Sequence, residues 1–318
     1  MSLSETKAEE ALNLLNNYGK EEAAKIMGVK TETLRRYCRI ARKTKDESEA
    51  PPEENLIRQI RDRYSDAELR AIAKGSFHER ESADSLKIQT GDRVKIGVIT
   101  DTHIGSKYSE PARLQAVLDF FAEQGTDIIC HCGDVTEGLS SRPGHVYELT
   151  DIGYHAQLDA AREAFEDTHC PVYMIDGNHD RWYLKSAGAC IVQELCRDNK
   201  KLIYMGHDEG DLDIKGVKLR LWHGEDASSY AFSYRLQKII ESFTGGEKPQ
   251  VLFAGHTHKS YYCFDRNVHC LSAGSMQKQS KWMRGKRIAC HYGFWIVDIE
   301  ISKKQVVNFT PTYYPFYE

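Results

Sequence analysis

The spacing of apolar and polar positions changes at Val94, and this change divides the chain. From there on, short apolar runs alternate with longer amphipathic stretches, which is typical of α/β proteins. The apolar runs predict strands at residues 94–100, 127–132 and 172–175. The amphipathic stretches predict helices at residues 111–124, 155–168 and 187–199. After residue 201 strands dominate, with one helix near residues 229–243, so we expect a mixed sheet or two packed sheets.

The first 45 residues have a helical pattern instead. Residues 8–17 are amphipathic, Gly28 permits a sharp turn, and a second helix is expected from Thr31 onward. This arrangement resembles a helix-turn-helix domain. The basic residues through which the second helix is expected to contact DNA are Arg35, Arg36, Arg39 and Arg42. The alternative is a solvated basic face that mediates protein contacts. Because one such unit binds DNA weakly alone, a homo-oligomer or a second DNA contact is expected.

Residues 46–92 are predicted to link this unit to the rest of the chain. Residues 46–55 are acidic and contain proline, which is typical of a linker. Residues 55–74 regain a helical pattern that ends at Gly75, which predicts two connector helices before a loop. The sequence therefore predicts three regions, with boundaries at residues 1–45, 46–92 and 93–318.

The composition limits the setting and the partners of the protein. The net charge of the 318-residue chain is −4, so any contact with nucleic acid must come from a local basic surface. The nine cysteines are scattered without a CxxC pair, which favours reduced thiols over a zinc site. The first residues do not resemble a signal peptide, and no apolar run approaches the roughly 20 residues of a membrane span. We expect a cytoplasmic protein without membrane contact.

Polar side chains follow five of the predicted strands. The sequences at these strand ends are Asp-Thr-His at 101–103, Gly-Asp at 133–134, Asp-Gly-Asn-His-Asp at 176–180, His-Gly-Glu at 223–225 and Gly-His-Thr-His at 255–258. In open α/β sheets, the loops at the carboxyl ends of strands converge on one site. A buried aspartate is also costly unless it is paired or bound to a metal. Each motif alone is more often a turn, a cap or a satisfied core histidine, but together they predict a metal site.

The motifs DTH, GD, GNHD, HG and GHTH occur in this order, and the series resembles the calcineurin-like metallophosphoesterases. The resemblance covers residues 94–310 and implies a four-layer αββα fold around two metal ions. The ligands that it implies are Asp134 as the bridge, Asp101, His103 and His258 on one ion, and Asn178, His223 and His256 on the other. Carboxylate, imidazole and amide donors without a thiolate suit Mn²⁺, which is our first expectation, or Fe or Zn²⁺.

The resemblance also implies catalytic residues. The family keeps the histidine that matches His179 out of the ligand set and places it at the leaving group, where an imidazolium can stabilise or protonate the departing oxygen. This histidine needs an orienting acid. Glu137 is our first expectation, because related enzymes place a carboxylate there, and Asp180 is the alternative. The sequence therefore predicts a metal-dependent phosphoesterase.

Two features bear on the substrate. Phosphoprotein phosphatases of this superfamily carry GDxVDRG and GNHE, whereas this chain has GDVTEG and GNHD, which is closer to the nucleases and phosphodiesterases. A long loop at 138–155 carries Arg142, and the segment 274–292 interleaves basic and aromatic residues. The residues of that segment which we expect to bind a polyanionic strand are Lys278, Lys281, Trp282 and Arg284. The alternative is a solvated loop whose tryptophan lies in the core.

Three functions follow as hypotheses. The first is a two-metal phosphodiesterase that acts on nucleic acid, on DNA more than RNA, and is recruited through the N-terminal helices. The second is a phosphoesterase on a small substrate, such as a cyclic nucleotide or a phosphomonoester, with N-terminal helices used for assembly or regulation. The third is a DNA-binding protein that retains a vestigial phosphoesterase fold, which the intact ligand set disfavours.

Overall fold

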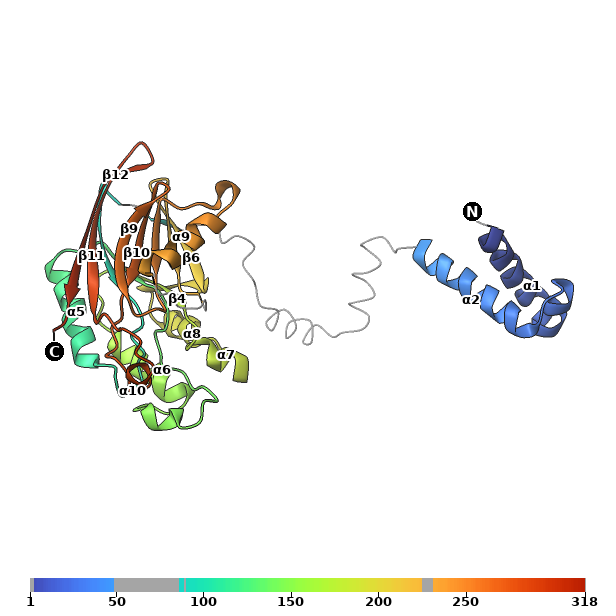
Figure 1. Cartoon of the computed structure of the whole chain (residues 1–318), viewed down its shortest axis with the longest axis horizontal. Helices are drawn as coiled ribbons and strands as arrows, with labels where there is room; N and C mark the ends of the chain where they lie inside the picture. The colour runs from blue at the N-terminus through green and yellow to red at the C-terminus, as the bar shows by residue number, and fades with distance from the viewer. Residues whose placement is uncertain (1–2, 49–85, 89, 225–230, 318) are drawn as a thin grey trace. The chain divides into compact units, whose positions relative to one another are not determined.

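The computed structural model describes residues 3–48, 86–88, 90–224 and 231–317. The chain forms two compact units, Met1–Phe77 and His78–Glu318 (Figure 1). Most of the predicted linker and both connector helices lie outside the described residues. The predicted boundaries at residues 45 and 93 therefore stay predictions.

The N-terminal unit contains two described helices, α1 (Leu3–Ile26) and α2 (Thr31–Ser48). Gly19 interrupts α1 with a non-helical backbone, and Gly28 turns the chain with a φ of 63° between the helices. Five buried side chains form the core cluster of this unit: Ala11, Ala23, Ala24, Leu34 and Cys38. Both helices are present as predicted, and their identification as a DNA-binding helix-turn-helix stays a prediction.

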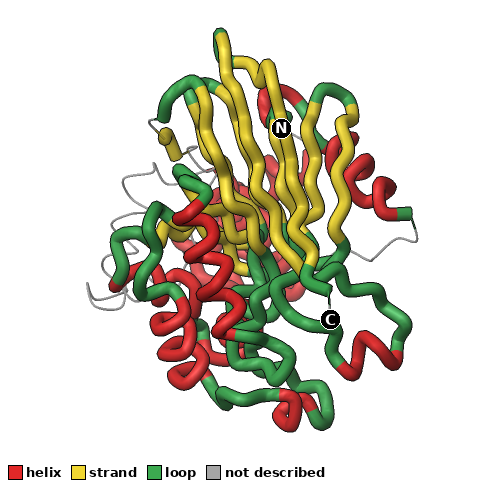
Figure 2. The backbone as a smooth tube through the Cα atoms, turned by 90° about the vertical axis from the view of Figure 1, so that its left-hand side faces the viewer, coloured by secondary structure: helices red, strands yellow, loops and turns green. Residues whose placement is uncertain are grey.

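The second unit is built from two six-stranded sheets with helices on their outer faces (Figure 2). Its strands are β1 (Leu86–Ile88), β2 (Arg93–Ile99), β3 (Ile128–His131), β4 (Val172–Asp176), β5 (Leu202–His207), β6 (Glu209–Ile214), β7 (Val217–Trp222), β8 (Val251–Ala254), β9 (Ser260–Asp265), β10 (Val268–Ala273), β11 (Gly293–Ser302) and β12 (Gln305–Pro315). Its helices are α5 (Pro111–Glu123), α6 (Tyr154–Ala164), α7 (Arg181–Ala187), α8 (Ile191–Asp198), α9 (Phe232–Ser242) and α10 (Lys281–Gly285). Single 3₁₀ turns cover His145–Glu148 and Gly245–Glu247.

Both sheets are mixed. One has the strand order β12-β11-β2-β3-β4-β5, in which β2 to β5 are parallel and β11 and β12 are antiparallel. The other has the order β1-β6-β7-β8-β10-β9, in which β7, β8 and β10 are parallel. Because β2, β3 and β4 run in parallel in one sheet and β7 and β8 in the other, their carboxyl ends present five loops for a single site.

Successive side chains of the strands point alternately into different core layers, of which the described residues of this unit form three. Val98 of β2 and Phe253 of β8 point into the interface between the two sheets. Their strand neighbours Ile99 and Leu252 point outward, toward α5, α6 and α8 on one side and α9 on the other. The layers therefore follow one another as helices, sheet, sheet and helix. This arrangement confirms the predicted αββα sandwich.

Two short helices were not predicted. α7 begins directly after the GNHD motif, and α10 lies within the segment 274–292, where only a loop was expected. Among the described residues, no helix is both long and apolar enough to cross a membrane.

Candidate metal centre

The first group of predicted ligands comes from the loops after β2 and β8. The Oδ1 atom of Asp101 lies 3.1 Å from Nε2 of His258 and 3.7 Å from Nε2 of His103. The two imidazole Nε2 atoms are 3.2 Å apart. Three donor atoms of three different side chains thus converge on one point, and they lie within 4.8 Å of one another.

The second group comes from the loops after β3, β4, β7 and β8. Nε2 of His223 lies 3.2 Å from Oδ2 of Asp134 and 3.1 Å from Oδ1 of Asn178. Nδ1 of His256 lies 2.8 Å from the same Asn178 oxygen. The imidazole of His223 is oriented by its other nitrogen, which donates a hydrogen bond of 2.7 Å to the carbonyl oxygen of Cys132.

Asp134 lies between the two groups. Its Oδ2 atom is 3.7 Å from Nε2 of His103 and 3.2 Å from Nε2 of His223, so one carboxylate oxygen faces both sets of donors. Two cations roughly 3.5–4 Å apart require such a shared anion. The structure thus brings all seven predicted ligands together in the two groups that the resemblance implied.

The donors fit divalent cations. Oδ1 of Asp101 is buried and accepts no well-aligned hydrogen bond among the described residues, so this oxygen is available to a cation. Burial lowers the pKa of His223, but the Asp134 carboxylate outweighs it and raises the pKa to about 9. The balance at His258 is similar: burial lowers its pKa, but Asp101 raises it to about 9. The buried carboxylates therefore attract positive charge strongly, as a cation site requires.

The backbone of these loops is strained at the ligands. Five of the seven, Asp101, His103, Asp134, His256 and His258, have φ between 46° and 75°. Non-glycine residues rarely adopt this left-handed conformation, and it concentrates at functional sites. In both loops that carry two ligands, Asp101 with His103 and His256 with His258, the two side chains reach the centre from positions two apart.

Gly177 allows the loop after β4 to lie close to Asp134 in the loop after β3. A Cβ atom at Gly177 would lie 2.7 Å from Nε2 of His223 and even closer to the carboxylate of Asp134. No side chain fits there, so the loop after β4 can approach Asp134 only because residue 177 has none.

Glu137 lies behind the first group of ligands. Its Oε2 atom is 2.9 Å from Nδ1 of His103, and its Oε1 atom is 2.9 Å from Nε2 of His145. Gln277 also donates to Oε2, at 3.2 Å. Since Nε2 of His103 faces the metal position, the Glu137 carboxylate orients a ligand in the manner of other carboxylate–histidine–metal arrangements.

His179 lies beside the same ligands. Its Nδ1 atom is 2.9 Å from the backbone carbonyl oxygen of Glu137 but 3.7 Å from the Glu137 carboxylate. A carbonyl oxygen can only accept, so Nδ1 carries a proton, and Nε2 is the nitrogen that can exchange one. The ring packs against Trp182 with a centroid separation of 4.0 Å. Burial lowers the pKa of His179, against the opposing charges of Asp134 and Glu137.

The structure places the carboxylate of Asp180 against the backbone rather than against the His179 ring. It accepts hydrogen bonds from the amides of Val135, Thr136 and Gly177, at 2.8–3.0 Å. This carboxylate therefore ties the turn after β3 to the turn after β4. Asp180 thus holds Asp134 and Asn178 at a fixed separation.

Four contributors to the centre were not singled out from the sequence. Three are the contacts just described, from His145, Gln277 and Trp182. The fourth is buried Arg235 of α9, which donates to the carbonyl oxygens of His223 and Gly255 at 2.7 and 3.1 Å. No local pattern marks these residues, because each reaches the centre from a separate segment.

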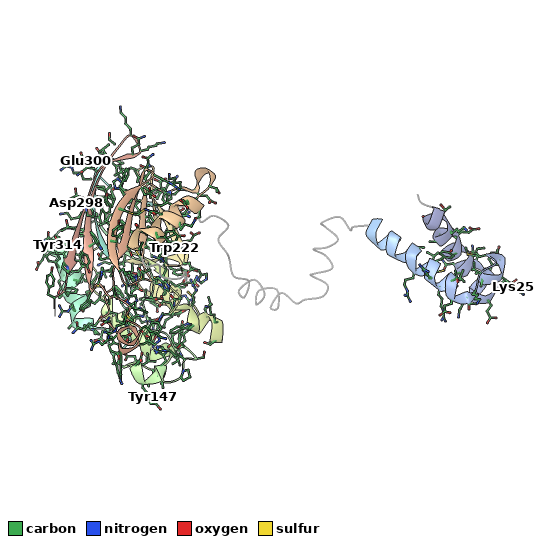
Figure 3. All side chains as sticks on the ribbon, viewed as in Figure 1. Lys25, Tyr147, Trp222, Asp298, Glu300 and Tyr314 are labelled. Atoms are coloured by element: carbon green, nitrogen blue, oxygen red, sulfur yellow. The ribbon has the colours of Figure 1, made fainter. Side chains whose placement is uncertain are left out.

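The predicted substrate residues lie at the same end of the sheets. Both ends of the segment 274–292 are fastened to ligand loops, by the hydroxyl of Ser275 on the carbonyl oxygen of Asp101 at 3.3 Å and by the amide of His291 on that of His258 at 2.7 Å. Trp282 of α10 is 46% exposed, so it does not lie in the core. Figure 1 shows α10 at the lower end of the unit, and Figure 3 shows Tyr147 projecting from the 138–155 loop at that end.

Two of the predicted basic residues are already paired. Arg142 binds Glu148 at 2.7 Å and also lies over the Trp282 ring, at 5.9 Å from the centroid. Lys278 binds Glu110 at 3.0 Å. Lys281 and Arg284 are exposed, and no described carboxylate pairs with either. In the N-terminal unit Arg35, Arg36 and Arg39 are exposed, and the side chain of Arg42 lies outside the described residues.

A four-layer sandwich with two adjoining groups of carboxylate, imidazole and amide donors defines a metal-dependent hydrolase. Residues 94–299 match the family model described as the calcineurin-like phosphoesterase superfamily domain. The match spans well over half of the chain, so the chain belongs to this superfamily. It is a metal-dependent phosphoesterase, as the sequence predicted.

Solved structures with similar folds include phosphoesterases. An archaeal phosphodiesterase is 17% identical, with 70% of this chain and all 100% of that chain covered and a TM-score of 0.43. Yfce, a phosphoesterase from E. coli, is 16% identical, with 68% and 98% covered and a TM-score of 0.41. Vps29 from Entamoeba histolytica is 13% identical, with 70% and 99% covered and a TM-score of 0.36. No curated protein matches the sequence. These likenesses are too distant to indicate a substrate.

Proposed function

We propose that the protein is a dinuclear-metal phosphodiesterase that hydrolyses phosphodiester bonds in nucleic acid. The observation that carries the proposal is the exposed basic and aromatic surface of α10. This helix lies in the segment 274–292, and both ends of that segment are hydrogen-bonded to metal-ligand loops. A strand whose scissile phosphate reached the metals would place neighbouring nucleotides against this surface. Lys281 and Arg284 would then contact phosphates, and Trp282 would stack on a base.

The chain's own residues account for the chemistry around the phosphate. Asp101, His103 and His258 would hold one cation, Asn178, His223 and His256 the other, and Asp134 both. When bound, two such cations, with Mn²⁺ our first expectation, activate water and neutralise the charge that develops on the phosphoryl group. His179 keeps Nδ1 fixed on the Glu137 carbonyl oxygen and presents Nε2, which can give a proton to the leaving oxygen.

The N-terminal unit has a supporting part in this proposal. Its exposed arginines lie on one helix, α2, which would bind DNA phosphates and bring the catalytic unit to its substrate. Removing residues 1–45 should then weaken DNA binding and raise KM for DNA, while kcat for a small phosphodiester stays unchanged.

One observation favours a different substrate. Arg142 joins the 138–155 loop to Trp282 of α10, so these two segments meet beside the centre. If this contact closes the site, the substrate is a small phosphoester rather than a polymer. The alternative thus predicts cleavage of cyclic nucleotides or phosphomonoesters in preference to DNA.

The test is a substrate panel for purified full-length protein with Mn²⁺, Zn²⁺ or Fe²⁺. It contains labelled single- and double-stranded DNA and RNA, cyclic nucleotides, a phosphomonoester and bis(4-nitrophenyl) phosphate. We expect cleavage of DNA, and its loss in Trp282→Ala with retained hydrolysis of the nitrophenyl diester. Hydrolysis of the nitrophenyl diester without cleavage of any polymer would refute the nucleic-acid proposal and leave the phosphoesterase assignment standing.

A further inference from the structure

A second cluster of metal-binding side chains lies outside the ligand set of the phosphoesterase centre. Its members are Asp176 at the end of β4, Cys190 at the N-cap of α8 and His207 at the end of β5. One donor atom from each lies within 4.8 Å of the other two. The three residues come from separate elements, so the fold, and not the local sequence, brings them together.

One distance within the cluster resembles the ligand separation around a tetrahedral ion. Oδ2 of Asp176 is 3.6 Å from the Cys190 sulfur and 2.5 Å from Nδ1 of His207. Tetrahedral zinc with bonds of about 2.0–2.3 Å separates its ligands by about 3.3–3.8 Å. The carboxylate–thiol distance already matches this value, and an ion would move the imidazole away by about 1 Å.

The two oxygens of Asp176 have different surroundings. Oδ1 lies 3.5 Å from the Arg181 guanidinium and 3.3 Å from the amide of Asp208. Oδ2 faces the thiol and the imidazole. The two oxygens of a metal-ligating carboxylate often differ in this way, because hydrogen bonds to one oxygen orient the other toward the ion.

The neighbouring phenol completes the cluster. The Tyr204 oxygen lies 2.9 Å from Oδ2 of Asp176, 3.0 Å from Nδ1 of His207 and 3.5 Å from the Cys190 sulfur. It therefore stands at the fourth corner, where it can bind the ion or a water on it. The His207 side chain is 32% exposed, which gives an ion a route from solvent.

We infer that Asp176, Cys190 and His207 bind one Zn²⁺ ion that is additional to the dinuclear centre. A thiolate, an imidazole and a carboxylate form a set that zinc prefers, whereas the seven ligands of the dinuclear centre include no thiolate. The ion would join β4 to β5 and to the start of α8. Because Asp176 precedes Asn178 by two residues, the same ion would hold the turn that carries Asn178 and His179.

Cobalt spectroscopy of the full-length protein tests the inference. Co²⁺ bound to a thiolate gives an intense near-ultraviolet charge-transfer band, and Co²⁺ on oxygen and nitrogen donors does not. We expect this band in wild-type protein titrated with Co²⁺, its loss in Cys190→Ala, and its displacement by Zn²⁺. The matched control is Cys263→Ala, which removes another half-buried thiol, on β9. This control should keep the band.

A second variant keeps the inference testable if Cys190→Ala does not fold. His207→Gln retains the thiol and should weaken Co²⁺ binding at this site by at least about 10-fold, as loss of ligand support does elsewhere. A wild-type protein without the band, or Cys190→Ala with the full band, would overturn the inference. Neither result depends on phosphoesterase activity, since the dinuclear centre contributes no thiolate.

Discussion

Replacing Glu137 by glutamine tests how the centre is supported. Each carboxylate oxygen faces an imidazole nitrogen at 2.9 Å, Oε2 from His103 and Oε1 from His145, and Gln277 donates to Oε2 as well. Glutamine keeps the size of the side chain but offers one oxygen and one NH₂ group. The NH₂ group must then face an N–H donor, so one buried donor loses its acceptor.

The magnitude follows from this mismatch. A buried donor without an acceptor costs about 1–3 kcal/mol. Loss of a carboxylate behind a ligating histidine lowers metal affinity by about 10–100-fold, which corresponds to about 1.4–2.8 kcal/mol. The cost of the unpaired donor and the free energy lost from metal binding are therefore of similar size. We therefore expect Glu137→Gln to need about 10–100 times more Mn²⁺ for half-maximal activity on a small phosphodiester.

The assay distinguishes two roles for Glu137: orienting the metal ligand His103 and acting on His179. Activity is measured against Mn²⁺ concentration, and turnover is compared again at saturating Mn²⁺. The matched control is Glu300→Gln, which removes a surface carboxylate paired with Arg93 at 3.4 Å and should leave the Mn²⁺ dependence unchanged. If Glu137→Gln kept wild-type metal affinity but lost turnover at saturation, its carboxylate would act on His179. The geometric reasoning would then be wrong, and the role predicted from the sequence would be right.

Three further changes have defined outcomes. His179→Ala should keep the metal content of the wild type, measured by elemental analysis, and lower kcat by about 10²–10⁴-fold; a parallel loss of metal would mean that His179 is a ligand. Gly177→Ala should lower metal content and abolish activity, because the added methyl group meets His223 and the Asp134 carboxylate. Its control, Gly246→Ala, adds a methyl group with no atom within 4 Å and should behave as wild type in both measurements. The double variant Lys281→Ala/Arg284→Ala should reduce the slope of log K for DNA against log salt by about 2, one for each phosphate contact; an unchanged slope would remove α10 from the DNA-binding surface.

The residue pattern predicted a site at the strand ends because each ligand motif follows an apolar run, and the family resemblance implied the two ligand groups. A strand end and a polar motif are both local features, and the parallel strand order brings the ends together. The alternation of apolar runs and amphipathic stretches predicted an α/β fold with a mixed sheet or two packed sheets, and the family resemblance implied the four-layer sandwich.

The supporting contacts could not be predicted in the same way. Glu137 was expected to orient His179 through its carboxylate, whereas the His179 ring nitrogen Nδ1 lies closer to the Glu137 backbone carbonyl oxygen, at 2.9 Å, than to that carboxylate, at 3.7 Å. Whether the carboxylate or the carbonyl oxygen of Glu137 approaches His179 depends on the conformation of a single turn, which residue type does not determine. Trp182 lies in a seven-residue helix, too short to show a periodic pattern. Gln277 reaches Glu137 from 140 positions away.

The left-handed backbone at five ligands has a consequence for the evolution of the protein. Each such residue costs on the order of 1–2 kcal/mol, so together they oppose folding by about 5–10 kcal/mol, a sum similar to the net stability of a whole domain. Glycine at any of these positions would relax the turn and remove a metal donor at once. Random mutation followed by selection for stability alone would therefore erode the centre toward glycine. Asp and His in these strained turns therefore place metal binding above stability in this chain, as is common at functional sites.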